Sequence, residues 1–123
     1  MKKILMAIMM VTSLTMMPTT AWAKELIDYG KMRITFYCPC DECSSGYGRK
    51  CAVEGHYCQS EHTIAVDPDV IDLGSKVKIG DKIYVAEDVG QHVVGDTIDV
   101  FVDTHEEVED LQVKYKHCWV VKD

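Results

Sequence analysis

Positive charge is scarce in this sequence: 13 lysines and arginines stand against 20 aspartates and glutamates, so the formal net charge is −7. Nucleic acid and anionic membrane surfaces repel a negatively charged chain, and we expect neither as a partner. Internal repeats and low-complexity tracts are also absent. What remains is the composition of a small, acidic globular protein.

The sequence also lacks an apolar run that is long enough to span a membrane comfortably. Its longest apolar stretch, residues 4–17, follows two lysines and is interrupted by threonine and serine. The Ala-Trp-Ala triplet at 21–23 has the small-x-small pattern of a signal-peptidase site. We therefore predict a signal peptide over residues 1–23 and one exported domain over residues 24–123, without stable membrane insertion. Its location would be the periplasm, the cell envelope or the extracellular space; an N-terminal anchor that is not removed is the alternative.

The predicted domain is long enough for one modest core. Strand-like runs separated by turn residues recur at 33–37, 63–66, 76–79, 82–87, 97–102 and 117–121. One short helix is indicated after Thr104, because Glu107 stands at the capping-box spacing. The segment 38–61 is rich in cysteine and glycine without periodicity, which predicts a cross-linked loop. Six short strands favour an all-β fold closed into a small barrel, because closure leaves no exposed sheet edge.

All six cysteines lie in the predicted exported part: Cys38, Cys40, Cys43, Cys51, Cys58 and Cys118. An even number of cysteines in a small exported domain is typical of disulfides. Our preferred pairings join Cys51 to Cys58 across a short loop, and Cys118 to one of the cysteines at 38–43, since the first and last strands are plausible neighbours. The crowding of three thiols at 38–43 makes a zinc site the alternative, although no pair of Cys-x-x-Cys knuckles is present. We expect no metal and no cofactor.

Three aspartates stand at the ends or centres of predicted strands. Asp67 follows the run 63–66, Asp88 closes the run 82–87, and Asp99 lies within the alternating run 97–102. Buried or cleft-facing carboxylates are costly unless they are partnered, so these positions favour a functional role. Taken singly, each is more often a turn or surface residue, and Asp67 before a proline is typical of a turn initiator.

Three ordered blocks around these aspartates carry a family resemblance: Thr-Ile-Ala-Val-Asp-Pro-Asp from residue 63, Tyr-Val-Ala-Glu-Asp-Val-Gly from residue 84, and Gly-Asp-Thr-Ile-Asp-Val-Phe from residue 95. With Ile-Thr-Phe-Tyr-Cys-Pro-Cys at 34–40, they resemble the three-aspartate (3D) domain over about residues 33–121. That domain occurs in exported bacterial cell-wall proteins and in the catalytic part of membrane-bound lytic transglycosylase A. The resemblance implies a six-stranded double-psi β-barrel that cleaves peptidoglycan between N-acetylmuramic acid and N-acetylglucosamine.

The resemblance also implies roles for the aspartates. Asp99 corresponds to the catalytic acid of the lytic transglycosylase relatives, with Asp67 and Asp88 as perturbing and orienting groups. In such an enzyme the C6 hydroxyl of the sugar attacks the anomeric carbon and gives a 1,6-anhydro product, so one acid serves both proton transfers. That acid has to be protonated near neutral pH, and a carboxylate about 5 Å away raises its pKa by roughly two units at an effective dielectric of about 20.

The expected substrate rim departs from the family pattern. The family usually has Gly-Ala-Ile-Lys where this chain has Gln-His-Val-Val at 91–94, so Val94 replaces a lysine. For a monomeric enzyme acting on peptidoglycan glycan strands, the expected substrate contacts are Tyr37, Tyr47, Gly90, Gln91 and His92.

Two other functions compete with the enzyme. A non-catalytic carbohydrate-binding barrel is the first, although simple sugar binding relies on aromatic platforms more than on clustered acids. The second is a divalent cation held by the three carboxylates with His62, His92 or His105, which the histidine spacing does not support.

Overall fold

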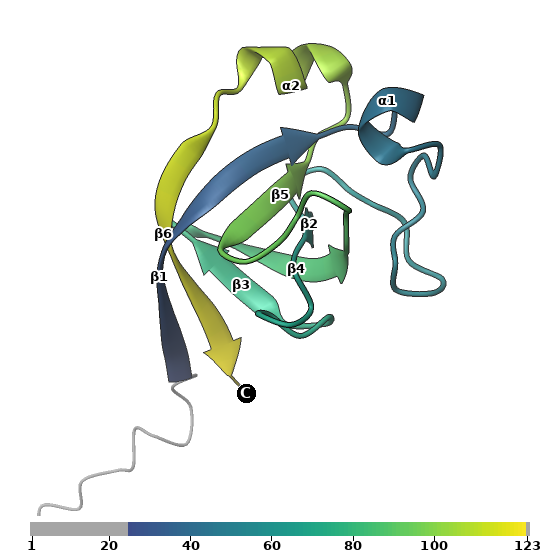
Figure 1. The fold of residues 1–123 in the computed structure, drawn as a ribbon. Helices are drawn as coiled ribbons and strands as arrows, with labels where there is room; N and C mark the ends of the chain where they lie inside the picture. Colours follow the sequence, from purple (N-terminus) through teal and green to yellow (C-terminus); the bar gives the residue numbers. More distant parts are fainter. Residues whose placement is uncertain (1–24, 123) are drawn as a thin grey trace, which may run out of the picture.

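The computed structural model describes residues 25–122, so the signal peptide predicted over residues 1–23 lies outside the described residues. The described chain forms a barrel closed in the order β1-β5-β2-β4-β3-β6 (Figure 1). Its strands are β1 (Glu25–Tyr37), β2 (Thr63–Ala65), β3 (Lys76–Ile79), β4 (Lys82–Asp88), β5 (Thr97–Phe101) and β6 (Lys114–Lys122), and its helices are α1 (Asp41–Ser44) and α2 (His105–Asp110). The small, six-stranded all-β barrel predicted from the sequence is confirmed.

Closure of the barrel brings strands together that are far apart in the sequence. β1 runs parallel to β5 and places Thr35 opposite Asp99. β2 runs antiparallel to β5, so Ala65 lies on the other side of Asp99. β2 also runs parallel to β4, where Ala65 pairs with Asp88. One row across four strands therefore holds Thr35, Asp99, Ala65 and Asp88.

The two-residue alternation along each strand decides which side chains fill the barrel. Ile98 and Val100 of β5 are buried in the core with Met32 and Ile34 of β1. Asp99 lies between the two β5 core residues and therefore projects from the outer face of the wall. The alternating pattern correctly identified the core face of this strand.

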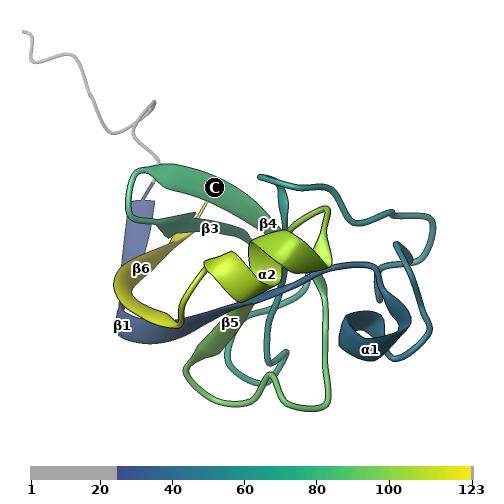
Figure 2. The same ribbon diagram turned by 90° about the horizontal axis from the view of Figure 1, so that it is seen from above.

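A second apolar cluster lies outside the barrel wall. Phe101 projects from the same face of β5 as Asp99, yet it is fully buried, because it packs edge-to-face against Tyr37 with 5.3 Å between ring centroids. Cys58 and Val93 complete this cluster from two loops. The segment between β1 and β2 thus covers one side of the barrel, and Figure 2 shows it looping out beside the strands together with α1.

The structure differs from the sequence prediction at both ends of the chain. β1 begins at Glu25 rather than near residue 33, and β6 begins at Lys114 rather than near residue 117. The two strands pair antiparallel over this whole length, with a bulge between Asp28 and Gly30, where Gly30 adopts a φ of 71°. The early residues lack alternation because the bulge breaks it, and only the partner strand supplies their hydrogen bonds.

The helices agree in part with the prediction. The side chain of Thr104 accepts a hydrogen bond from the Glu107 amide at 3.2 Å and caps α2 as expected. No sequence pattern indicated α1, which is a single turn within the cysteine-rich segment. Neither helix of the described chain has the length and apolar character that a membrane crossing requires.

Candidate active site and cysteine clusters

Asp99 is half-buried at the centre of β5. The hydroxyl of Thr35 donates a hydrogen bond to its Oδ1 at 2.9 Å. Burial raises the pKa of Asp99 to about 6; the charge of Asp88 adds to the rise, whereas the Thr35 hydrogen bond and the charge of Arg33 oppose it. A carboxyl group with this pKa is partly protonated near neutral pH, which is what a proton donor requires.

Asp88 ends β4 with both carboxylate oxygens occupied. The Tyr37 hydroxyl donates to Oδ2 at 2.7 Å. The amides of Ala52 and Val89 donate to Oδ1 at 3.0 and 2.9 Å. Burial, with the nearby Asp88 charge, holds the pKa of Tyr37 well above its usual value, so the phenol remains a donor. Through the Ala52 amide, Asp88 fastens the segment between β1 and β2 to the barrel.

Asp67 joins two turns. Its Oδ1 accepts the Asp69 amide at 2.9 Å, and its Oδ2 accepts the Gly95 amide at 2.8 Å. These backbone hydrogen bonds, that from Gly95 foremost, lower the pKa of Asp67. Asp67 is not among the groups that shift the pKa of Asp99. The contacts of Asp67 are therefore those of a turn initiator. The expectation that Asp67 raises the pKa of Asp99 is wrong.

The spacing of the strands explains why Asp88 has only a secondary effect on Asp99. Neighbouring strands lie about 4.8 Å apart, so residues separated by the whole of β2 are about 10 Å apart. That is twice the separation assumed from the sequence, and it weakens the repulsion accordingly. Burial, rather than a crowd of carboxylates, is the main reason that the pKa of Asp99 is raised.

Comparison with known families identifies this arrangement. The family model of the 3D domain matches residues 62–122, a range that runs from the start of β2 to the end of β6 and contains all three aspartates. The chain belongs to the 3D domain family. This domain is a peptidoglycan-related barrel and is associated with lytic transglycosylase-like proteins. No curated protein matches the chain.

The expected substrate contacts occupy different environments in this 3D domain. Tyr47 is 72 % exposed, whereas Tyr37 is buried and bonded to Asp88, so Tyr37 is unsuited to stacking on a sugar. Gly90, Gln91 and His92 form an exposed loop between β4 and β5. A Cβ at Gly90 would lie 3.0 Å from Cγ2 of the buried Val93, so a larger residue there would require the Val93 side chain to shift.

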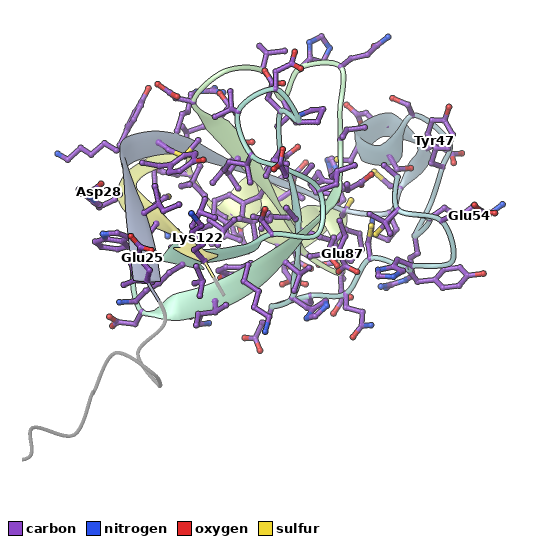
Figure 3. All side chains as sticks on the ribbon, turned by 90° about the horizontal axis from the view of Figure 1, so that it is seen from below. Glu25, Asp28, Tyr47, Glu54, Glu87 and Lys122 are labelled. Atoms are coloured by element: carbon purple, nitrogen blue, oxygen red, sulfur yellow. The ribbon has the colours of Figure 1, made fainter. Side chains whose placement is uncertain are left out.

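The sequence offered no signal for Glu87, the buried neighbour of Asp88. His62 contacts its Oε1 at 3.1 Å, His56 contacts its Oε2, and the Thr63 hydroxyl donates to Oε1 at 3.0 Å. Figure 3 shows Glu87 on the side of the 3D domain that also carries Tyr47. Its partners lie in or next to the cysteine-rich segment, so Glu87 holds that segment against β4.

Six free thiols are present in the described chain. The Sγ atoms of Cys51 and Cys58 lie 2.8 Å apart, so the structure brings the first predicted pair together without a bond between them. Burial raises the pKa of both thiols above the ordinary range of cysteine. The disulfide between these two residues stays a prediction.

The second predicted pairing is wrong. Cys118 is fully buried in the barrel core, where β6 pairs it with Gly30 of β1 and with Ile79 of β3. Cys38 lies eight residues beyond Gly30, roughly 26 Å of strand at about 3.3 Å per residue. Disulfide-bonded Cα atoms lie within about 7 Å of each other. The strands are neighbours as expected, but the register keeps these cysteines apart.

The remaining three cysteines gather around a histidine. The thiol–histidine cluster comprises Cys38, Cys40, Cys43 and His105, whose possible ligand atoms all lie within 4.8 Å of one another. Within residues 25–122, the three aspartates do not form such a group, and His105 belongs to the thiols rather than to the carboxylates. The cation site considered among the aspartates is therefore not supported.

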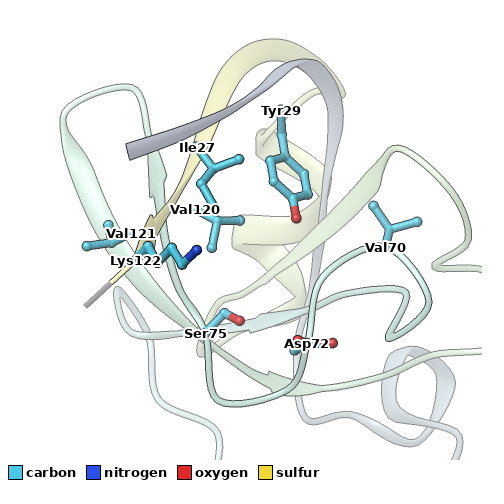
Figure 4. A pocket seen from close by; sticks show the side chains of 8 residues that line it. All are labelled: Ile27, Tyr29, Val70, Asp72, Ser75, Val120, Val121 and Lys122. Atoms are coloured by element: carbon cyan, nitrogen blue, oxygen red, sulfur yellow. The ribbon is translucent and has the colours of Figure 1, made fainter. Parts of the chain in front are cut away.

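Two of the hollows on the surface of the described chain differ in size and lining. The larger, about 460 Å³, is lined by Ile27, Tyr29, Val70, Asp72, Ser75, Val120, Val121 and Lys122 (Figure 4). The smaller, about 270 Å³, includes Phe36, Tyr84 and Lys114 in its lining. Neither is lined by a predicted catalytic residue. Asp99 instead lies on the outer wall of the 3D domain.

Proposed function

We propose that this 3D domain protein is an exported lytic transglycosylase, which cleaves the β-1,4 bond between N-acetylmuramic acid and N-acetylglucosamine in peptidoglycan during cell-wall turnover or remodelling. Asp99 is the catalytic acid. The observation that carries the proposal is a half-buried carboxyl group on the outer barrel wall with a pKa of about 6, bonded to the Thr35 hydroxyl. An exported monomer acting on glycan strands fits this role.

The surroundings of Asp99 favour a transglycosylase over a hydrolase. A typical glycosidase uses two working carboxyl groups, about 5–5.5 Å apart for retention or about 6.5–9.5 Å apart for inversion. Asp88 and Asp67 accept hydrogen bonds on both of their oxygens and serve as anchors for loops. Asp99 has the raised pKa that suits proton donation, whereas backbone hydrogen bonds lower the pKa of Asp67.

A single acid is sufficient when the substrate supplies its own nucleophile. Protonated Asp99 donates its proton to the glycosidic oxygen of the leaving N-acetylglucosamine as the bond to the anomeric carbon breaks. The C6 hydroxyl of N-acetylmuramic acid then bonds to that carbon, and the Asp99 carboxylate accepts the hydroxyl proton. The product is a 1,6-anhydro sugar, the acid is regenerated, and no water is consumed.

The proposal is tested by digesting purified peptidoglycan and identifying the soluble products by mass spectrometry. Anhydromuropeptides are expected, and Asp99→Asn should lower their rate of release by about 10²–10⁴, the range of general acid–base catalysis. Asp110→Asn, which removes the same charge from an exposed position on α2, is the matched control and should act like the wild type. Reducing muropeptides would instead identify a hydrolase, and an unchanged rate for Asp99→Asn would remove Asp99 from the mechanism.

A non-catalytic peptidoglycan-binding domain is the second candidate, and the rim of the site favours it. Val94 is 62 % exposed at the position where the family resemblance implies a lysine. Loss of a charged sugar contact would weaken positioning of the substrate for cleavage. Sedimentation with insoluble peptidoglycan, without any soluble product, would support binding alone.

A further inference from the structure

The thiol–histidine cluster lies at one end of the barrel, apart from the three aspartates. Cys38 directly follows β1, and His105 is the first residue of α2, the element after β5. Cys40 and Cys43 come from the N-cap and the body of α1. Figure 1 shows β1 leading into α1 while the chain rises from β5 to α2 beside it. The parallel pairing of β1 and β5 therefore brings two distant stretches of sequence to one point.

Distances within the cluster match those of a tetrahedral site. The His105 Nδ1 atom lies 3.7 Å from Sγ of Cys38, 3.5 Å from that of Cys40 and 3.4 Å from that of Cys43. Zinc–sulfur and zinc–nitrogen bonds of about 2.3 and 2.05 Å at tetrahedral angles place sulfur and nitrogen about 3.6 Å apart. All three observed distances lie close to that value.

The separation between sulfur atoms fits a tetrahedral zinc site less closely, but it remains compatible with one. Cys38 and Cys40 lie 3.2 Å apart at Sγ, closer than the separation of about 3.8 Å expected across a tetrahedral zinc site. Rotation of one side chain absorbs a difference of this size. A disulfide, by contrast, would join two of the three sulfurs and would leave one thiol and the imidazole without a role.

The surroundings of the cluster are those of a metal site. Nε2 of His105 lies 3.4 Å from Oε1 of Glu109, which orients the imidazole so that Nδ1 faces the thiols. Metal-bound histidines commonly use a carboxylate in this way. The Cys43 amide also donates to Sγ of Cys40 at 3.4 Å, a bond that stabilises a thiolate.

We propose that Cys38, Cys40, Cys43 and His105 bind one zinc ion. Three thiolates and one imidazole complete its coordination, so the site is closed and structural rather than catalytic. On binding, the thiols release their protons to solvent. The ion joins the ends of β1 and β5, which stay paired up to this point because the Val102 amide donates to the Tyr37 carbonyl at 2.8 Å.

Such a site would support the position of Asp99 without contacting it. Asp99 and its partner Thr35 lie on the same two strands, a few residues before the zinc ligands. The inference does not depend on the proposed enzymatic function, because its measurements are metal content and spectroscopy.

The test measures zinc bound to the protein purified after expression of the whole chain. Elemental analysis should find about one zinc ion per chain, as for one closed site. Cys40→Ser and His105→Ala should each lower this content at least about tenfold, in line with loss of one of four ligands. Cys51→Ser and His92→Ala change a thiol and an imidazole outside the cluster, and should keep the full content.

Two further measurements distinguish loss of the zinc site from failure of a variant to fold. His105→Cys supplies a fourth thiolate and should restore zinc binding. Cobalt substitution of the wild-type protein should give the thiolate charge-transfer and intense visible bands of a tetrahedral, sulfur-rich site. The proposal is overturned if the wild-type protein neither contains zinc nor takes up zinc or cobalt. Retention of zinc by His105→Ala, or disulfides among the three cluster cysteines in the isolated protein, would overturn it as well.

Discussion

Replacement of Asp99 by asparagine is expected to stabilise the fold at neutral pH. The folded protein raises the pKa of Asp99 from 3.8 to about 6. At about 1.36 kcal/mol per pKa unit, this shift corresponds to about 3 kcal/mol against the ionised form in the folded state. The asparagine side chain carries no charge, so the variant avoids the cost of the buried charge. Part of this gain is offset by the cost of burying the amide group of asparagine. We expect a net gain of about 1–3 kcal/mol.

The pH dependence has a definite sign. Between about pH 4 and pH 6 the folded state holds a proton on Asp99 that the unfolded state has released. The contribution of Asp99 to the free energy of unfolding therefore falls as the pH rises through this window and is constant above it. The advantage of Asp99→Asn should be largest above about pH 6 and should vanish near pH 4.

Urea unfolding of both proteins between pH 4 and pH 8 measures this effect. Asp67→Asn is the control with the opposite sign, because backbone hydrogen bonds lower the pKa of Asp67 and favour its ionised form. That variant should be less stable than the wild type throughout pH 4 to pH 8, because the lowered pKa of Asp67 lies below this range and its carboxylate stays ionised there. A constant difference between Asp99→Asn and the wild type from pH 4 to pH 8 would refute the raised pKa of Asp99.

Three further outcomes are expected. Thr35→Val removes a hydrogen bond that lowers the pKa of Asp99, so the alkaline limb of the activity profile should move to higher pH; movement to lower pH would contradict the assigned contact. Tyr37→Phe leaves Asp88 without its phenol donor and should lower the free energy of unfolding by about 1.5–3 kcal/mol in denaturant titrations, the range for hydrogen bonds to charged groups. Cys118 is fully buried and burial raises its pKa to about 11, so mass spectrometry should find it alkylated last in the native protein and readily after unfolding.

Local pattern was sufficient to predict the fold class. In β5 the alternation of Ile98, Asp99 and Val100 identified a strand with one apolar face, and the capping-box spacing at Thr104 located α2. Alternation and capping-box spacing depend only on neighbours along the chain, so they can be recognised in the sequence alone. Local pattern missed the first residues of β1, because their hydrogen bonds come from β6, about 90 residues away.

The sequence also singled out the three aspartates, but it assigned two of them an inexact role. Asp67 and Asp88 were expected to raise the pKa of Asp99 by proximity, whereas burial is the main cause and Asp67 binds two backbone amides instead. Thr35, the hydrogen-bond partner of Asp99, carried no signal because the contact depends on the register of two strands 64 residues apart. Register is a property of the closed barrel and not of either strand alone.

The cysteines show most clearly which features the sequence determines and which depend on the tertiary structure. Their number and the crowding at 38–43 are visible in the sequence and leave disulfides and zinc as competing interpretations. The pairing of β1 with β5 decides that His105 joins three of them, and the register of β6 decides that Cys118 does not. Residue identity determines which atoms are able to bind a metal, whereas only the closed barrel brings four of them, from two distant segments, to within ligand distance of one point.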